Sequence, residues 1–324
     1  MLETAGAPVR SSPRPPLDLS GKRSRRTSEY VIRWLLIGCS LVTVLTTIGI
    51  IVILVVESVN FFREVPVFDF LFGRTWTPLF EGKNQQFGVL PLVVGTLMTT
   101  AVAAIIALPL GLMAAIYLSE YAGSTMRSFL KPVLEMLAGV PSIVYGFFAL
   151  TFITPVLLKP ILDVGTFNGL SAGIAIGIMT LPMVASLSED ALRAVPGSLR
   201  EASYALGATK LETTVRVIVP AAISGVIASF ILAVSRAIGE TMIVAIAAGQ
   251  APAGQTGGSG GMWDLSRSMQ TMTGFIAYTF SSDVGRTSVA FYSLFGVGLL
   301  LFIMTFAMNM LSQWITTRFR EAYE

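Results

Sequence analysis

The chain alternates between long runs of apolar residues and short polar segments. A helix needs about 20 consecutive apolar residues to cross a membrane, and six runs reach that length. They cover roughly residues 32–57, 92–118, 133–158, 170–190, 217–248 and 288–316. The last two are long enough to tilt or kink. The pattern therefore predicts an all-α integral membrane protein with six transmembrane helices.

The composition supports a membrane protein and excludes several other classes. Of the 324 residues, 53% are hydrophobic and 13% are charged, whereas a soluble protein carries about 25% charged residues. The chain has no histidine, the commonest metal ligand and neutral-pH base, and its single cysteine, Cys39, excludes an internal disulfide. With a net charge of +3, nothing suggests nucleic-acid binding. We predict no metal, no cofactor and no catalytic residue.

Lysine and arginine in the loops predict the orientation, because cytoplasmic loops are enriched in both. With the N-terminus inside, fifteen of these residues lie in inside segments and six in outside segments, so both termini are expected in the cytoplasm. Residues 1–29 are expected to form a disordered basic tail, and residues 30–69 the first transmembrane helix and the start of an outer loop. The main membrane domain is expected over 70–320. The first apolar run is longer than a signal-peptide core, so we interpret it as a retained anchor.

The segment between the fourth and fifth runs carries helix signals of its own. Ser198 follows a Pro-Gly pair and stands three residues before Glu201, the spacing of an N-terminal capping box. Gly207 suits the left-handed position that ends many helices. A second helix is predicted to begin near Thr209 and to enter the membrane by Val217.

Leu199, Ala202 and Leu206 place an apolar stripe on this short cytoplasmic helix. Two interpretations stay open on physical grounds: a helix that lies on lipid headgroups, or a helix that docks a cytoplasmic partner. The helix is rich in small residues, which favours docking, because a lipid-lying helix more often carries bulky anchors and more lysine. The small residues are Ala202, Ser203, Ala205, Gly207 and Ala208.

Two charges, Arg236 and Glu240, lie inside the fifth apolar run. A charge at the centre of a membrane helix costs roughly 2.5–3.5 kcal/mol, so both charges need compensation. Four residues apart on one continuous helix, the two side chains are expected within reach of each other. The same helix face carries mostly small residues, Ser229 among them, and such a face packs against protein or lines a cavity.

Two roles for the pair stay open. It is either a buried ion pair that fixes helix packing or part of a transport path. Apolar residues of similar volume are often as stabilising as a buried pair, and the planar fork of an arginine suits phosphate oxygens. Tyr145 is a further candidate for lining the path. Pro109, Pro141 and Pro182 each interrupt a run, and we interpret them as kinks.

The cytoplasmic segment "EASYALGATKLETTVRVIVP" resembles the signature loop of the permeases of ABC importers. The matching residues are Glu201, Ala202, Ser203, Gly207, Ile218 and Pro220, with Ser203 in place of a second alanine. Further stretches resemble the phosphate-importer permeases of the PstC type, and together they cover most of residues 70–250. They are "WTP" at 76–78, "FGVLPLVVGTLMTT" at 87–100, "ALPLGLMAAIYLSEY" at 107–121, "LAGVPSIVYGFFAL" at 137–150 and "SRAIGETM" at 235–242.

This resemblance implies the type I ABC importer permease fold in a bacterial cell membrane, with a cytoplasmic coupling loop at 194–216. It implies a second homologous permease subunit, a dimer of ATP-binding subunits and an external phosphate-binding protein as partners, with phosphate as substrate and lipid around the spans. The ATPase would be contacted through the 198–211 loop by Glu201, Ala202, Ser203, Gly207 and Pro220. The path residues would be Arg236, Glu240, Ser229 and Tyr145.

The chain has no Gly-x-x-x-x-Gly-Lys phosphate loop, so it is not expected to hydrolyse ATP or to be an enzyme. Two alternatives stay open beside the phosphate importer. One is a secondary transporter or channel for an inorganic anion. The other is an ABC permease for another oxyanion, molybdate or sulfate.

Overall fold

The computed structural model describes residues 23–80, 82–252 and 261–318. Within those ranges every regular element is a helix, apart from an isolated antiparallel bridge between Trp76 and Phe87. The predicted tail up to residue 22 and residues 253–260 lie outside the described residues. The chain divides into two compact units, residues 1–53 and 54–324, and each is described by itself.

The smaller unit holds most of helix α1, which runs from Arg23 to Glu64. It therefore begins within the segment we expected to be a disordered tail. Nearly every described side chain from Glu29 to Ile53 is exposed, although the segment is strongly apolar. Exposed apolar side chains all round a helix suit surrounding lipid, so the predicted anchor over 32–57 agrees with a helix that is long and apolar enough to span.

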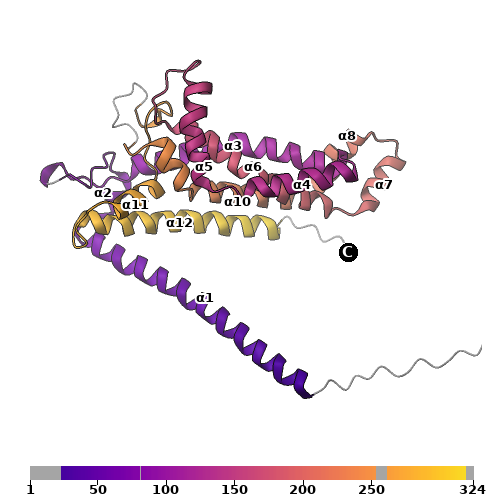
Figure 1. The fold of residues 1–324 in the computed structure, drawn as a ribbon, viewed down its shortest axis with the longest axis horizontal. Helices are drawn as coiled ribbons and strands as arrows, with labels where there is room; N and C mark the ends of the chain where they lie inside the picture. Colours follow the sequence, from indigo (N-terminus) through magenta and orange to yellow (C-terminus); the bar gives the residue numbers. More distant parts are fainter. Residues whose placement is uncertain (1–22, 81, 253–260, 319–324) are drawn as a thin grey trace, which may run out of the picture. The chain divides into compact units, whose positions relative to one another are not determined.

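Three helices form the centre of the larger unit: α3 (Leu90–Ile116), α6 (Gly169–Arg193) and α10 (Ile223–Ile238). Helix α6 packs against both of the others (Figure 1). The α3–α6 contact is close, because a Cβ atom added to Gly173 would lie 2.6 Å from the Cβ atom of Val102. Small residues allow such close helix packing in membranes.

Shorter elements complete the larger unit. The π-helical segment η2 (Tyr117–Tyr121) continues α3, and helices α7 and α8 lie at one end of the unit while α11 lies near the other (Figure 1). The remaining elements are α2 (Val67–Phe72), η1 (Gly82–Asn84), α4 (Ser124–Ala138), α5 (Ser142–Phe148), η3 (Ala149–Leu158), α7 (Gly197–Ala205), α8 (Lys210–Thr213), η4 (Thr214–Ile218), α9 (Val219–Ala221), η5 (Val244–Ala248), η6 (Gly261–Trp263), α11 (Met272–Ser281) and α12 (Val289–Arg318).

Four of the predicted spans are long single helices, and two are broken. The described residues contain four helices long and apolar enough to cross a membrane, or up to six if each of two bent pairs counts as one span. The pair Ser124–Ala138 and Ser142–Leu158 bends by 87°, and the pair Lys210–Ala221 and Ile223–Ile238 bends by 71°. The runs over 133–158 and 217–248 are therefore sharply bent, where a kink was predicted at Pro141 and the fifth run was long enough for one, and six spans stand if each bent pair is one.

Local chemistry explains both breaks. Pro141 precedes α5 and lacks the backbone N–H that a continuous helix would use, and it disfavours helical geometry in the residue before it. Helix α4, on the other side of that break, is strongly amphipathic and buries no residue. Pro220 stands two residues before the second bend. Pro109 and Pro182, in contrast, lie inside helices that continue through them.

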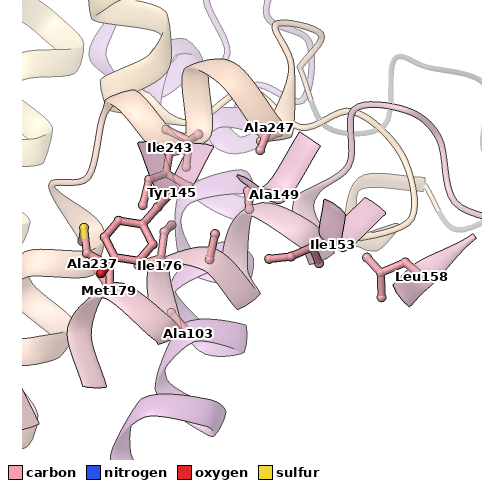
Figure 2. Close-up of a cluster of buried hydrophobic side chains, with 14 of the residues drawn as sticks. Ala103, Tyr145, Ala149, Ile153, Leu158, Ile176, Met179, Ala237, Ile243 and Ala247 are labelled. Carbon is pink, nitrogen blue, oxygen red and sulfur yellow. The ribbon is translucent and has the colours of Figure 1, made fainter. Parts of the chain in front are cut away.

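Two large apolar clusters hold the larger unit together. The first, which we call the aromatic cap, contains Phe61, Phe70, Trp76, Phe87 and Phe275. The second, drawn in Figure 2, gathers side chains from α3, α5, η3, α6, α10 and η5. Aromatic rings in the cap meet edge to face, which adds to the stability from burial alone.

Candidate functional site

Arg236 lies near the end of α10. Its side chain is exposed, and so is Leu232 one turn earlier, whereas Ala233 and Ala237 are buried. Within the described residues, no hydrogen bond or ion pair to Arg236 is found. The helix places Arg236 about 20 Å along its axis from Ile223 at 1.5 Å per residue. The apolar helix α10 therefore carries a guanidinium without a partner among the described residues, far from the end of the helix that follows the predicted coupling loop.

Glu240 is not on the same helix as Arg236. Helix α10 ends at Ile238, with Gly239 as its C-terminal cap, and Glu240 follows in the break before η5. Its Oε1 atom accepts hydrogen bonds from the backbone N–H groups of Met242 at 3.1 Å and Ile243 at 3.3 Å. The first N–H groups of a helical turn have no partner inside the turn, and Glu240 supplies one. The continuous helix on which Arg236 and Glu240 were expected within reach of each other is therefore wrong.

Ser229 is buried where α10 packs against α6. Its hydroxyl is 2.7 Å from the hydroxyl of Ser188 on α6 and donates to the backbone carbonyl of Val226 at 2.8 Å. Near it, a Cβ atom on Gly225 would come within 2.5 Å of Ala191. The small-residue face of α10 thus packs against protein, one of the two uses expected for it. The assignment of Ser229 to the path stays a prediction.

Tyr145 is also buried, in the second apolar cluster. Figure 2 shows its ring among labelled side chains that include Ile176, Met179 and Ile243. Its hydroxyl donates to the backbone carbonyl of Leu137 at 2.9 Å. A buried tyrosine normally finds such a partner, and here the bond ties α5 to the end of α4 across the break. Tyr145 thus has a packing position in this structure, and its assignment to the path stays a prediction.

The predicted coupling loop forms two short helices joined at Gly207. Gly207 has a φ of +84°, the left-handed conformation that was predicted from the sequence. The predicted capping box at Ser198 and Glu201 is wrong, because α7 already starts at Gly197 after Pro196. A capping box does occur one helix later. Thr209 accepts from the backbone of Glu212, whose carboxylate accepts from the backbone N–H of Thr209 at 2.9 Å.

That second bond also affects the charge of Glu212. The backbone N–H and the hydroxyl of Thr209 both donate to the carboxylate and lower the pKa of Glu212. Hydrogen bonds to a carboxylate favour its charged form. The cap at the start of α8, which lies where a second helix was predicted, is therefore present when Glu212 is ionised.

Helix α7 has an outer and an inner face. Glu201, Ala202 and Leu206 are exposed, with Leu206 89% exposed. Ser203 is buried instead, and its hydroxyl is 2.9 Å from the hydroxyl of Thr213 on α8. Pro220 lies at the bend into α10. Of the residues expected to contact an ATPase, Ser203 is thus placed inside the loop and Pro220 in its hinge.

The sequence-based reasoning missed a buried carboxylate, Glu189, near the end of α6. Its side chain is 1% exposed and forms ion pairs with Arg127 and, at 2.8 Å, with Lys131 on α4. Lys131 also reaches Asp190 at 3.1 Å. These pairs fasten α4, which buries no side chain of its own, to α6. The available signal was an acidic residue within the fourth apolar run.

A second missed pair joins Glu120 in η2 to Arg200 in α7, at 2.9 Å. Its members stand eighty positions apart, so no local pattern links them. No group of three or more potential metal-ligating residues is found among the described residues.

Comparison with solved structures shows which fold the chain has. The chain is similar to the permease in an inward-facing structure of the MetNI methionine ABC transporter, with a TM-score of 0.52 and 19% identity, over 72% of this chain and 95% of that chain. A second crystal form of the same transporter gives a TM-score of 0.50 and 20% identity. The fold is therefore that of the membrane subunit of a type I ABC importer.

Comparison of sequences defines the family. Residues 107–321 match the family described as binding-protein-dependent transport system inner membrane component. The chain is 32% identical to the probable ABC transporter permease protein YqgH of Bacillus subtilis, over 93% of this chain and 94% of that protein. It is 33% identical to the phosphate transport system permease protein PstC of Mesorhizobium japonicum, over 78% of this chain and 79% of that protein. The chain belongs to this family of inner-membrane permeases, as a member of the PstC type.

Membership places the chain in a bacterial inner membrane as a multi-pass permease subunit. It is not an enzyme, since ATP hydrolysis belongs to a separate subunit of such systems. Its partners are ATPase and permease subunits and a substrate-binding protein. Because the chain belongs to a family of ABC transporter permeases, it is not a secondary transporter or an anion channel.

Proposed function

We propose that the chain carries phosphate across the membrane as one half of an ATP-driven importer. A second homologous permease forms the other half of the path, two copies of an ATPase drive it, and an external binding protein delivers phosphate. Relatives named as phosphate transport permeases support the substrate, because several are 30–33% identical over more than three quarters of this chain. The other oxyanions, molybdate and sulfate, remain the competing substrates for a test.

The exposed guanidinium of Arg236 is the observation that carries this proposal. A charge that faces lipid inside a span is costly, up to roughly 2.5–3.5 kcal/mol at a helix centre. Arg236, in the last turn of α10, has no compensating partner within the described residues. A water-filled path shared with the second permease removes that cost. Intramembrane charges generally mark substrate or ion pathways for this reason.

The chemistry of Arg236 fits a phosphate oxyanion. A guanidinium offers two parallel N–H donors that match two oxygens of one phosphate. Because Glu240 directs its Oε1 to backbone N–H groups, it does not neutralise Arg236, which stays available to an anion. The Oε2 atom of Glu240 is suited to accept from the hydroxyl of a protonated phosphate. Arg236 thus attracts the substrate, and Glu240 shapes the break beside it.

The outer face of α7 supports docking of the ATPase. Leu206, the residue that follows α7, is almost fully exposed, and Glu201 and Ala202 are exposed on the helix itself. A nearly free leucine next to small side chains suits insertion into a cleft of another protein. Gly207 makes the turn after it at a positive φ that other residues adopt only with strain.

Substitution of Arg236 by glutamine tests the path. In the assembled complex, we expect phosphate uptake to fall by at least about tenfold, the scale of losing a charged hydrogen bond, while the ATPase still co-purifies. Arg286→Gln is a matched control, because Arg286 is exposed and lies outside the helices. Uptake at the normal rate in Arg236→Gln would remove Arg236 from the path. Competition of uptake by molybdate or sulfate, stronger than by unlabelled phosphate, would reassign the substrate.

Substitution of Gly207 by aspartate tests the docking surface. We expect loss of ATPase co-purification, because aspartate is strained at a φ of +84°. Gly123→Asp is the control, since Gly123 has ordinary backbone angles and no atom near its added Cβ. Phosphate movement by the purified single chain in vesicles without nucleotide would contradict the proposal.

A further inference from the structure

Arg200 stands on the inner face of α7 and points into the membrane domain. Its Nη1 atom donates to the backbone carbonyl of Val195 at 2.6 Å. Its Nη2 atom donates to the carbonyl of Leu192 and to Oε1 of Glu120, both at 2.9 Å. The Arg200 side chain therefore donates to three acceptors outside α7. One lies in η2, one in the last turn of α6, and one in the segment that follows α6.

The first of these elements is the end of the second span. Glu120 lies in the π-helical segment η2, and its side chain is only 6% exposed. Among the described residues, Arg200 is the cation that pairs with it, and the hydroxyl of Ser119 donates a second bond at 2.9 Å. A nearly buried carboxylate is costly without such partners. The pair is therefore a constrained contact, unlike an exposed surface ion pair.

The second element is the end of the fourth span. Leu192 lies in the last turn of α6, and Val195 follows that helix. The last carbonyls of a helix have no partner within it, and a cation is favoured at that end. Leu192 and Val195 also belong to an apolar cluster with Ala115 and Ile218. Apolar surroundings strengthen hydrogen bonds between polar groups.

Helix α7 has few other means of fixing its orientation. It has nine residues, and helices shorter than about 12 residues are marginal by themselves. Leu199, Arg200 and Ser203 face inward, and Arg200 is the one of these three whose side chain bonds to the second and fourth spans. A displacement of α7 must therefore pull on Glu120 and on the end of α6 through Arg200.

We propose that Arg200 is the positioning residue that transmits movement of α7 to the second and fourth spans. The inference rests on the proposed function, in which an ATPase grips the outer face of α7. Arg200 does not touch the ATPase or phosphate. Its guanidinium makes α7, η2 and the end of α6 move as one body, so that ATP-driven displacement reaches the path.

The test measures phosphate imported per ATP hydrolysed in the full complex in proteoliposomes, with the external binding protein present. We expect Arg200→Gln to assemble with the ATPase and to hydrolyse ATP within about twofold of the unsubstituted complex. Phosphate per ATP should fall by at least about tenfold, the scale of losing charged hydrogen bonds. Arg200→Lys should fall less, since an ammonium keeps the charge but not the planar fork.

Two further variants complete the design. Glu120→Gln removes the charge of the partner but leaves both carbonyl bonds, so its phosphate per ATP should fall less than that of Arg200→Gln. Arg318→Gln is the matched control, because Arg318 is exposed at the end of α12 and should leave the ratio unchanged. If Arg200→Gln fails to assemble, the phosphate per ATP measured for Glu120→Gln tests the role of Arg200 instead.

The outcomes separate this inference from the proposed function. An unchanged ratio in Arg200→Gln, or in Glu120→Gln where the first does not assemble, overturns the role of Arg200 alone. Uptake and hydrolysis that fall in equal proportion also overturn it, because that result indicates loss of folded complex. An unsubstituted complex that hydrolyses ATP without importing phosphate contradicts the proposed function instead.

Discussion

The two ends of the larger unit are held together by different forces. At the end near α11, the aromatic cap joins Phe61, Trp76 and Phe275 by packing, and Phe61 is fully buried. At the end near α7, buried Glu189 and nearly buried Glu120 each bind arginine or lysine from another helix. We call this second region the ionic end.

The difference matters for movement. Apolar packing is non-directional, and its stability grows with the area removed from water, so the cap resists any separation of its parts. Charge-assisted hydrogen bonds are directional and depend on distance, so elements joined by them keep a set geometry while they move as bodies. The cap suits a fixed region, whereas the ionic end suits the region where a partner delivers force.

The largest expected effect is loss of packing in the cap. Phe61→Ala should destabilise the protein by about 3–5 kcal/mol, the usual cost of deleting a buried aromatic ring. Thermal unfolding of the purified complex measures it. Phe68→Ala is the control, because Phe68 is 77% exposed and should change stability little. Equal effects of the two substitutions would contradict the cap as a packed core.

A smaller effect is expected at the ionic end. Glu189→Gln keeps the shape of the side chain but leaves Arg127 and Lys131 without their shared anion. We expect a loss of about 1–3 kcal/mol, below the 3–5 of a fully buried pair, because both cations keep partial contact with water. Hydrogen exchange should rise in α4, which these pairs hold.

Asp190→Asn is the control for that substitution. Asp190 also pairs with Lys131, but its side chain is 60% exposed, so the loss should stay below about 1 kcal/mol. If the two variants raise exchange in α4 equally, burial of Glu189 is not what anchors that helix.

The smallest effect is expected in the exposed cap of α8. Thr209→Ala removes a side-chain cap, and such changes cost about 1 kcal/mol. Protease cleavage between α7 and η4 should accelerate by roughly fivefold, since 1.4 kcal/mol is a factor of ten. Lys210→Ala, next to it, leaves the cap intact and should cleave at the original rate.

The hydrogen-bonded N-terminal cap of α8, formed by Thr209 and Glu212, also has a predictable pH dependence. Because the pKa of Glu212 is lowered in the folded loop, its contribution to stability is full above the unfolded pKa, near 4.3. It is lost as pH falls through the lowered value. Cleavage of the loop should therefore rise below about pH 4, and Glu212→Gln should remove that rise. A rise at the same pH in Glu212→Gln would assign it to another group.

Much of the fold was predictable because the signals are local. Apolar runs long enough to span a membrane identified α1, α3, α6 and α12, and Gly207 predicted the left-handed turn that it forms. The breaks in the third and fifth spans were harder to predict. Pro141 and Pro220 are visible in the sequence, but a proline also sits inside continuous α3 and α6, so its effect depends on the surrounding packing.

By itself, the sequence determined the class of protein, its family and the position of the short helices proposed to dock an ATPase. Hydrophobic runs, helix-end signals and short motifs each depend on a few neighbouring residues, so they can be recognised in the sequence alone. Only the tertiary structure decided that Ser229 and Tyr145 are buried, that Arg236 and Glu240 do not pair, and that Glu120 meets Arg200. Those facts depend on which side chains, distant in the sequence, come into contact in the folded protein. The energy of a charged group depends on its surroundings in space more than on its position along the chain.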